Sequence, residues 1–123
     1  MIDYAEAQAA CETYIRSLQA SDVETLLALF DDNASIEDPV GTALREGKSA
    51  LREFYSVAWE GVLSAALSGV ARLAGNEVAF PFTVTAGTVG EELTINIIDV
   101  FKFNEAGKVV SMRAFWGPNN IGS

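Results

Sequence analysis

The stretch LTINIIDVFKF, Leu93–Phe103, has the alternating pattern of a β-strand with one apolar face. That face carries, in order, Leu93, Ile95, Ile97, Asp99, Phe101 and Phe103. Because burying an unpaired carboxylate is costly, Asp99 must find a charge or hydrogen-bond partner, or stay protonated and become a donor. The alternative is a β-bulge that shifts the register by one residue and turns Asp99 to solvent.

An N-terminal helix over Asp3–Ala20 is predicted by a stripe of residues at spacings of three and four. The stripe consists of Tyr4, Ala7, Cys11, Tyr14, Ile15 and Leu18. Tyr14 therefore faces the interior. Its hydroxyl either bonds to a nearby backbone group, as is usual for a buried tyrosine, or points into a cavity.

A second acid, Asp38, repeats the pattern of Asp99. One face of the short strand predicted over Ala34–Gly41 carries Ala34, Ile36, Asp38 and Val40. Pro39 favours an extended backbone at Asp38 and supplies no amide hydrogen to its carboxylate, which leaves that carboxylate free to act as a base. The alternative is an Asp-Pro turn followed by Gly41.

Two further helices are predicted. Ser21-Asp22-Val23-Glu24 has the form of a capping box and opens a helix that Asp31-Asp32-Asn33 ends. Its inward residues are Val23, Leu26, Leu27 and Phe30. The other helix runs over Gly47–Glu60, with a buried stripe of Leu51, Phe54, Tyr55 and Ala58. Tyr55 thus places another hydroxyl on an apolar face.

The rest of the chain alternates as strands between turn residues. Strands are predicted over Leu63–Leu73, Val78–Thr88 and Lys108–Trp116, and the tail Gly117–Ser123 is predicted as loop. The inward residues are Leu63, Ala65, Leu67, Gly69, Ala71 and Leu73, then Val78, Phe80, Phe82, Val84 and Ala86, and finally Val110, Met112, Ala114 and Trp116. Pro81 on an outward face indicates a bulge or an edge position.

Helices followed by strands indicate one α+β domain over residues 1–123. We expect three N-terminal helices to pack on one face of a curved, mainly antiparallel sheet. The other face carries Ile98, Val100 and Phe115, which is more apolar area than a solvated face usually shows. We therefore expect a homodimer contact on part of this face.

The chain contains no histidine, which removes histidine general bases, Ser-His-Asp and Cys-His nucleophile pairs and most zinc sites. Carboxylates and tyrosines must then move the protons of any reaction. The net charge of -9 argues against sequence-independent binding to nucleic acid or to an anionic membrane. The sequence shows no export signal or membrane-spanning run, and Cys11 cannot form an intramolecular disulfide, so we expect a cytoplasmic protein.

Polar groups on otherwise apolar faces occur on four predicted elements, at Tyr14, Asp38, Tyr55 and Asp99. One shared cavity accounts for them better than four coincidences. Such a cavity is predicted to be lined by Phe54, Phe82, Val84, Phe101, Met112 and Trp116. It would suit a large, flat, apolar ligand with one polar end.

The chain resembles the ketosteroid isomerases, which are steroid Δ5-to-Δ4 isomerases with the cone-shaped NTF2-like fold of the SnoaL-like superfamily. The resemblance covers nearly the whole chain. It is carried by Tyr14, LFDDNASIEDPVG around Asp38, REFY at 52–55, IIDVFKFN around Asp99, and GKVVSMRAFWG near the end.

The resemblance implies a Δ5-3-ketosteroid substrate and a reaction that needs neither a cofactor nor a metal. Asp38 would carry the C4 proton to C6, while Tyr14 and protonated Asp99 donate hydrogen bonds to the dienolate oxygen. Tyr55 would support Tyr14 through a hydrogen bond. The apolar residues that line the predicted cavity would hold the steroid.

The chain also departs from the ketosteroid isomerases. Ala86 and Thr88 stand where the family carries aromatic residues, and the stretch Trp59–Gly69 matches poorly. These differences concern the shape of the substrate, because the proton-moving groups are intact.

Other functions of this superfamily are alternatives. Its dehydratases and polyketide cyclases generally rely on a histidine with an aspartate, and the chain has no histidine. A site like that of limonene-epoxide hydrolase needs an Asp-Arg-Asp arrangement around a water, but Arg72 and Arg113 are predicted to face outward. A non-catalytic carrier of apolar ligands, or a partner-binding module of the NTF2 type, would need the cavity but not Asp38.

Overall fold

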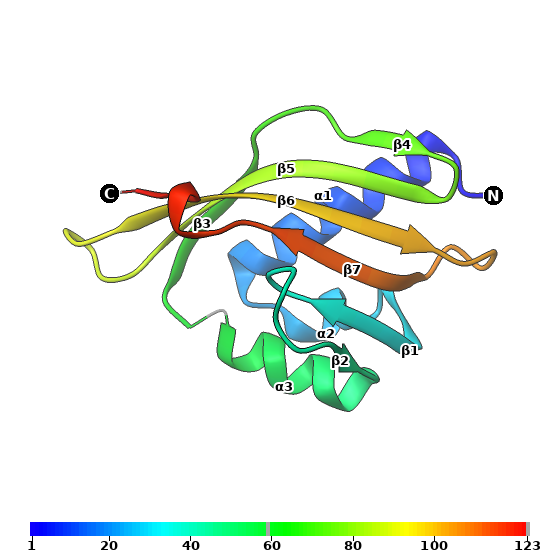
Figure 1. Cartoon of the computed structure of the whole chain (residues 1–123), viewed down its shortest axis with the longest axis horizontal. Coiled ribbons are helices and arrows are strands. Elements are labelled where there is room, and N and C mark those ends of the chain that lie inside the picture. Colours follow the sequence, from blue (N-terminus) through cyan, green and yellow to red (C-terminus); the bar gives the residue numbers. More distant parts are fainter. Residues whose placement is uncertain (59, 123) are drawn as a thin grey trace.

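The computed structural model describes residues 1–58 and 60–122, which form helices packed against a curved sheet (Figure 1). The helices are α1 (Tyr4–Ala20), α2 (Val23–Leu27) and α3 (Lys48–Ala58), with a short 3-10 helix, η1, at Pro118–Asn120. The strands are β1 (Phe30–Glu37), β2 (Arg45–Glu46), β3 (Val62–Leu67), β4 (Arg72–Ala74), β5 (Glu77–Ala86), β6 (Leu93–Phe103), β7 (Val109–Phe115) and β8 (Ile121–Gly122). Trp59 and Ser123, which belong to the predicted third helix and the predicted tail, lie outside the described residues.

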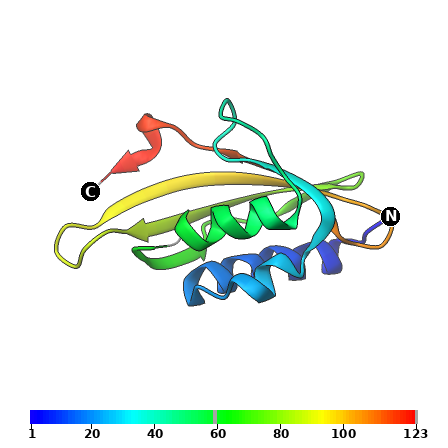
Figure 2. The same cartoon turned by 90° about the horizontal axis from the view of Figure 1, so that it is seen from below.

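The sheet is mixed and open. Its strands follow the order β2-β1-β7-β6-β5-β3, with β4 paired to β5 and β8 paired to β6. Among the described strands, only β1 and β7 pair in parallel. Figure 2 shows α1, α2 and α3 together on one side of the long strands. The predicted α+β architecture, with three helices on a curved and mainly antiparallel sheet, is confirmed.

Strand β6 has the predicted register. Asp99, Phe101 and Phe103 are buried, whereas Ile98 on the opposite face is 47% exposed. β5 pairs along the whole length of β6 and places Phe80 opposite Asp99. No bulge turns Asp99 to solvent, so the carboxyl lies on the inner face, in the core.

Helix α1 begins with a capping box, in which the Asp3 side chain accepts from the Glu6 amide at 2.8 Å. Its buried residues are Ala7, Cys11, Tyr14, Ile15, Ser17 and Leu18. The prediction that Tyr4 belongs to the buried stripe is wrong, because this residue is 45% exposed. Tyr4 stands at the first position of the helix, where its hydroxyl donates to the Ala71 carbonyl at 3.2 Å. No helix in the described part of the chain has both the length and the apolar character to cross a membrane.

Helix α2 is shorter than predicted at both ends. Asp22 caps it by accepting from the Thr25 amide at 3.1 Å, whereas Ser21 ends α1 with a left-handed backbone, φ 55°. The predicted capping box beginning at Ser21 is therefore wrong by one residue. Phe30 is buried as predicted, but it is the first residue of strand β1 and does not belong to a helix. The following acidic residues lie within that strand, where its register against β7 shifts.

Helix α3 ends at Ala58, so Glu60 of the predicted helix lies in the turn that follows. Leu51 and Tyr55 are buried as predicted, and Phe54 is half-buried. Ala58 is exposed, because it stands in the last turn of the helix.

The predicted strand over 34–41 ends at Glu37, and Asp38 is the first residue beyond it. Ala34 and Ile36 are buried as expected, and the chain after Asp38 forms turns. The prolyl residue that follows Asp38 supplies no amide hydrogen to continue the strand ladder, which is consistent with an end at this point. The two sequence interpretations, strand and Asp-Pro turn, therefore each describe part of the segment.

The strand predicted over Leu63–Leu73 is divided into β3 and β4. Leu63 was expected to face inward, but it is 38% exposed because the register against β5 shifts by one residue there. Gly69 lies in the exposed connection between the two strands. β5 has neighbours on both sides, so Pro81 does not lie on an edge strand as one of the two predictions had it. It stands at the gap between β3 and β4, where its carbonyl accepts from the Ser68 amide at 3.0 Å.

Two expectations near the C-terminus are wrong. Val109 is buried in place of Val110, because the register between β6 and β7 shifts by one residue at this point. The tail after Gly117 is not only loop, since it forms η1 and then β8, which pairs with Thr94 and Ile95. β7 pairs only with the second half of β6. On the same edge, the first half of β6 pairs with β8.

Candidate active site

A half-open cavity of about 240 Å³ is bounded by α1, α3 and the inner face of the sheet. Among the residues selected from the sequence, those that line it are Tyr14, Asp38, Phe54, Tyr55, Phe82, Val84 and Trp116. Asp99, which the sequence also placed in the shared cavity, is not a lining residue and is buried close to Tyr14. Ala86, which the resemblance connected with the shape of the substrate, also lines the cavity, whereas sequence reasoning missed Leu18, Ala58, Val62, Ile95 and Ile97. Most of these lie on faces whose inward direction was predicted, so the same periodicities point to them.

Tyr14 and Tyr55 share a hydrogen bond of 2.9 Å between their hydroxyls, in which either can donate. Both side chains are buried, and burial is the largest cause that raises the pKa of each phenol well above its usual value. Both hydroxyls therefore keep their protons at neutral pH. The Tyr14 ring packs edge-on against Phe101, with 5.1 Å between centroids, which helps to hold the hydroxyl in place.

Asp99 is 1% exposed, and neither of its carboxyl oxygens has a hydrogen-bond partner among the described residues. Burial raises the pKa of Asp99 well above its usual value, and the charge of Asp38 acts in the same direction. The Tyr14 hydroxyl lies near enough to oppose this shift, but its hydrogen bond is to Tyr55. Burial therefore favours the protonated, neutral form of Asp99, whose O–H has no acceptor among the described residues.

Asp38 lines the cavity from the segment just after β1. Its Oδ1 accepts a hydrogen bond of 2.9 Å from Trp116 Nε1, and its Oδ2 accepts none from the described residues. Burial raises the pKa of Asp38, while the Trp116 hydrogen bond and the positive charge of Arg45 act against that rise. One oxygen is held and the other is free, which is the arrangement that a general base needs.

Phe101 and Met112 lie behind the cavity wall. Both are fully buried, and neither reaches the lining of the cavity. Their strands place them on the predicted inner face, but the Tyr14 ring covers Phe101, which stands opposite Met112 across the β6 and β7 pair. They pack behind the residues that line the cavity, so the prediction that they line it is wrong.

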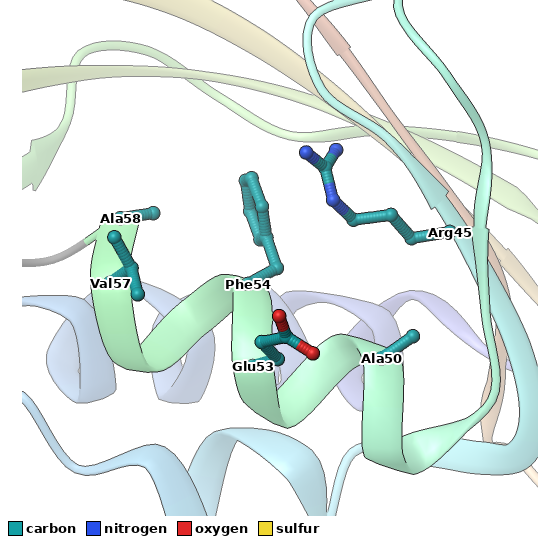
Figure 3. A pocket seen from close by; sticks show the side chains of 6 residues that line it. All are labelled: Arg45, Ala50, Glu53, Phe54, Val57 and Ala58. Atoms are coloured by element: carbon teal, nitrogen blue, oxygen red, sulfur yellow. The ribbon is translucent and has the colours of Figure 1, made fainter.

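A second, larger hollow of about 440 Å³ lies along α3 (Figure 3). It is lined by Arg45, Ala50, Glu53, Phe54, Val57 and Ala58. Phe54 and Ala58 also line the smaller cavity, so they form a wall between the two. The tyrosines and Asp38 lie only on the smaller cavity, which is therefore the candidate active site. In the part of the chain that the structure describes, no three Cys, Asp or Glu side chains are grouped to hold a metal ion.

Comparison with known proteins places this geometry in a family. The model of the SnoaL-like domain matches residues 11–112. A steroid Δ-isomerase of Nocardioides simplex is 35% identical over 117 residues, which cover 95% of this chain and 94% of that protein. The epoxide hydrolase LasB of Streptomyces lasalocidi is 30% identical over 109 residues, which cover 85% of this chain but only 39% of LasB.

Solved structures share the fold over nearly the whole chain. SalBIII, described as an epoxide hydrolase/cyclase-like enzyme in pyran ring formation in the polyether salinomycin, superposes with a TM-score of 0.88 at 32% identity and covers 99% of this chain and 98% of its own. RV0760c from Mycobacterium tuberculosis superposes with a TM-score of 0.85 at 22% identity, over 99% of this chain and 98% of its own. The latter similarity concerns the fold alone.

Proposed function

This chain belongs to the SnoaL-like domain family and has an NTF2-like fold, and we propose that it is a steroid Δ-isomerase that converts Δ5-3-ketosteroids to Δ4-3-ketosteroids. One observation carries the proposal. A single apolar cavity holds the free carboxylate oxygen of Asp38 and the hydroxyl of Tyr14, with the neutral acid of Asp99 nearby. The similarity to a protein named steroid Δ-isomerase supports the same reaction.

The proposed reaction moves one proton. The Asp38 carboxylate takes it from C4, and the electrons of that bond shift toward the C3 oxygen to give a dienolate. Tyr14 and neutral Asp99 donate hydrogen bonds to this oxygen while it is negative, and each such donor contributes about 3 kcal/mol. The Asp38 acid then returns the proton to C6, which leaves the double bond between C4 and C5 and restores the carboxylate.

Asp99 does not line the cavity, but it lies close to Tyr14, which does, and its missing partner supports an oxygen ligand beside Tyr14. A buried polar group without a partner costs about 1–3 kcal/mol, and such groups in native proteins call for an explanation. A ketone oxygen within reach of both Asp99 and Tyr14 would supply the missing acceptor. The apolar rings of the substrate would then lie against Phe54, Phe82 and Trp116, on the lining of the cavity.

Turnover of 5-androstene-3,17-dione tests the proposal, because the conjugated product absorbs in the ultraviolet. We expect Asp38→Asn to lower kcat by about 10²–10⁴-fold, the usual contribution of a positioned base. The same variant should still bind equilenin, a phenolic steroid whose oxygen resembles the dienolate. Near-normal turnover by Asp38→Asn would show that another group is the base. Binding of steroids without any turnover by the wild-type protein would favour a carrier.

A second candidate function is an epoxide hydrolase or cyclase. The similarity to LasB and to SalBIII favours it. Asp38 would then activate a water or a substrate hydroxyl, while Tyr14 or Asp99 donates to the epoxide oxygen. Arg72 and Arg113 are exposed, so neither is placed for the Asp-Arg-Asp arrangement weighed from the sequence. Incubation with epoxy alcohols and with the steroid, side by side, separates the two chemistries by product mass.

We also propose that the protein is a homodimer. The outer face of the sheet carries Ile98 and Phe115, which are 47% and 42% exposed, with the half-buried Val100 near them. These residues lie on adjacent strands, where Ile98 pairs with Phe115 and Val100 pairs with Arg113. Exposed apolar side chains grouped in this way are typical of a contact between subunits.

A further inference from the structure

We propose that Arg45 is a positioning residue for Asp38, whose ionised form it stabilises from the neighbouring strand without binding the carboxylate. The inference rests on the proposed role of Asp38 as a base. Arg45 lies on β2, a strand of two residues that shows no periodicity in the sequence. Its position relative to Asp38 follows only from the pairing of strands.

Strand register places Arg45 beside Ile36, two residues before Asp38. In the antiparallel pair of β1 and β2, Arg45 stands directly opposite Ile36, which is fully buried. Asp38 follows Ile36 by two residues, just beyond the end of β1. Diagonal neighbours of this kind are about 7–8 Å apart, within reach of a long side chain.

The contacts of Arg45 leave its charge unpaired. The guanidinium lies over the Phe54 ring, with Cζ 4.7 Å from the ring centroid, and Figure 3 shows it at the Phe54 side of the hollow. Nη1 is buried without a hydrogen-bond partner, and no described carboxylate makes an ion pair with this side chain. Phe54 also lines the cavity that holds Asp38. Arg45 therefore carries a positive charge that no described carboxylate pairs with. The Phe54 ring that it contacts lies between Arg45 and the cavity that Asp38 lines.

A cation near the base, but not in contact with it, suits proton transfer. Burial raises the pKa of Asp38, and the charge of Arg45 opposes that rise. Charges in a poorly solvated interior are weakly screened, so this effect extends over several ångströms. A direct salt bridge would occupy the lone pair that must accept the proton and would make Asp38 a weaker base.

The other ionisable groups that act on or respond to Asp38 come from the helices and the central strand. Tyr14 on α1, Tyr55 on α3 and Asp99 on β6 each have a raised pKa to which Asp38 contributes. The two tyrosines are therefore neutral near pH 7, and burial favours the neutral form of Asp99. Glu53 on α3 lines the same hollow as Arg45 but is exposed. Arg45 is therefore the described cation that favours the carboxylate form of Asp38.

Three variants test the inference. Arg45→Met removes the charge and keeps an apolar chain against Phe54, whereas Arg45→Lys keeps the charge. Arg113→Met is the matched control, because Arg113 pairs with Glu37, next to Asp38 in the chain, with 3.2 Å between Nε and Oε1. Two quantities are measured for each variant: the pH dependence of kcat/KM, and the titration of the Asp38 carboxyl by ¹³C NMR, assigned from its loss in Asp38→Asn.

We expect Arg45→Met to raise both midpoints by about one pH unit, in line with the loss of a nearby opposite charge. At pH values below both midpoints, kcat/KM of Arg45→Met should then be about tenfold lower than that of the wild-type protein, while the two plateaus at higher pH should differ little. Arg45→Lys should restore both midpoints, and Arg113→Met should shift them much less.

Three outcomes would decide against the inference or separate it from the isomerase proposal. If Arg45→Met lowered kcat/KM equally at every pH and left the NMR midpoint in place, Arg45 would only hold Phe54. An equal shift in Arg113→Met would mean that any nearby charge has the same effect. If no protein turned over the steroid but the NMR midpoint still moved in Arg45→Met, the isomerase proposal would fail and the coupling of Arg45 to Asp38 would stand.

Discussion

At the scale of single residues, Asp99 makes the stability of the fold depend on pH. Its carboxyl is buried with no described partner, and its pKa is raised well above the usual value. In the unfolded chain the same group ionises at its ordinary pKa, about 3.9. Between these two pKa values the folded state binds more protons than the unfolded state, so stability decreases as pH rises through that interval.

Asp99→Asn is expected to remove this dependence, because the amide does not titrate. Above a pH of about 4, the free energy of unfolding of the wild-type protein should fall relative to that of Asp99→Asn by about 1.4 kcal/mol per pH unit, until the pH reaches the folded-state pKa. Urea denaturation of both proteins at several pH values between acid and neutral measures the difference. A constant difference across that range would mean that Asp99 is ionised in the folded protein.

The two tyrosines are expected to differ in their contribution to catalysis. Tyr14→Phe removes a proposed donor to the dienolate and should lower kcat by about 10²–10³-fold. Tyr55→Phe removes the hydrogen bond of 2.9 Å that holds the Tyr14 hydroxyl but no proposed donor to the dienolate, so its effect should be smaller. Steady-state kinetics of both variants with the same steroid check the order. A larger loss in Tyr55→Phe would assign the donor role to Tyr55.

At the level of elements, the junction between α1 and α2 depends on Asp22. Its Oδ1 accepts from the Thr25 amide at 3.1 Å, and its Oδ2 accepts from the Thr25 hydroxyl at 2.6 Å. Ser21 contributes no side-chain cap and instead ends α1 in a left-handed conformation. The two neighbouring polar residues thus have different roles, which a substitution at each can separate.

Asp22→Ala should lower the midpoint of thermal unfolding by a few degrees, because the first turn of α2 loses its cap. Ser21→Ala, one residue earlier, is the control and should leave the midpoint almost unchanged. Circular dichroism during heating compares the two variants with the wild-type protein. If Ser21→Ala were the more damaging change, the capping box predicted from the sequence would be right after all.

For the whole molecule, the two faces of the sheet differ. The helices cover the inner face, while the outer face exposes Ile98 and Phe115. Ile98→Lys should convert the proposed dimer to a monomer, because a charge on this face opposes its burial. Val89→Lys is the matched control, since Val89 is 80% exposed and lies in the turn between β5 and β6. Sedimentation at micromolar concentration measures both variants, and a monomeric wild-type protein would contradict the proposal.

Much of the fold could be predicted because long elements repeat their pattern many times. The alternation of β5 and β6 and the spacing in α1 each extend over several inward residues, so one irregular position does not change the assignment. The errors at Leu63 and Val110 fall where a single residue shifts the pattern, whereas those at Tyr4 and Ala58 fall at the ends of helices. Such bulges depend on the partner strand, and the sequence of one strand contains no information about them.

Local periodicity was enough to predict that Asp99 faces inward on β6 and that Tyr14 faces inward on α1, and both side chains are buried. Three relations could be seen only once the chain was folded: Tyr14 bonds to Tyr55, Phe101 lies behind the cavity wall, and Arg45 stands next to the segment of Asp38. These relations join residues far apart in the chain. They depend on strand register and on the packing of helices against the sheet, and no pattern within one element specifies either of them.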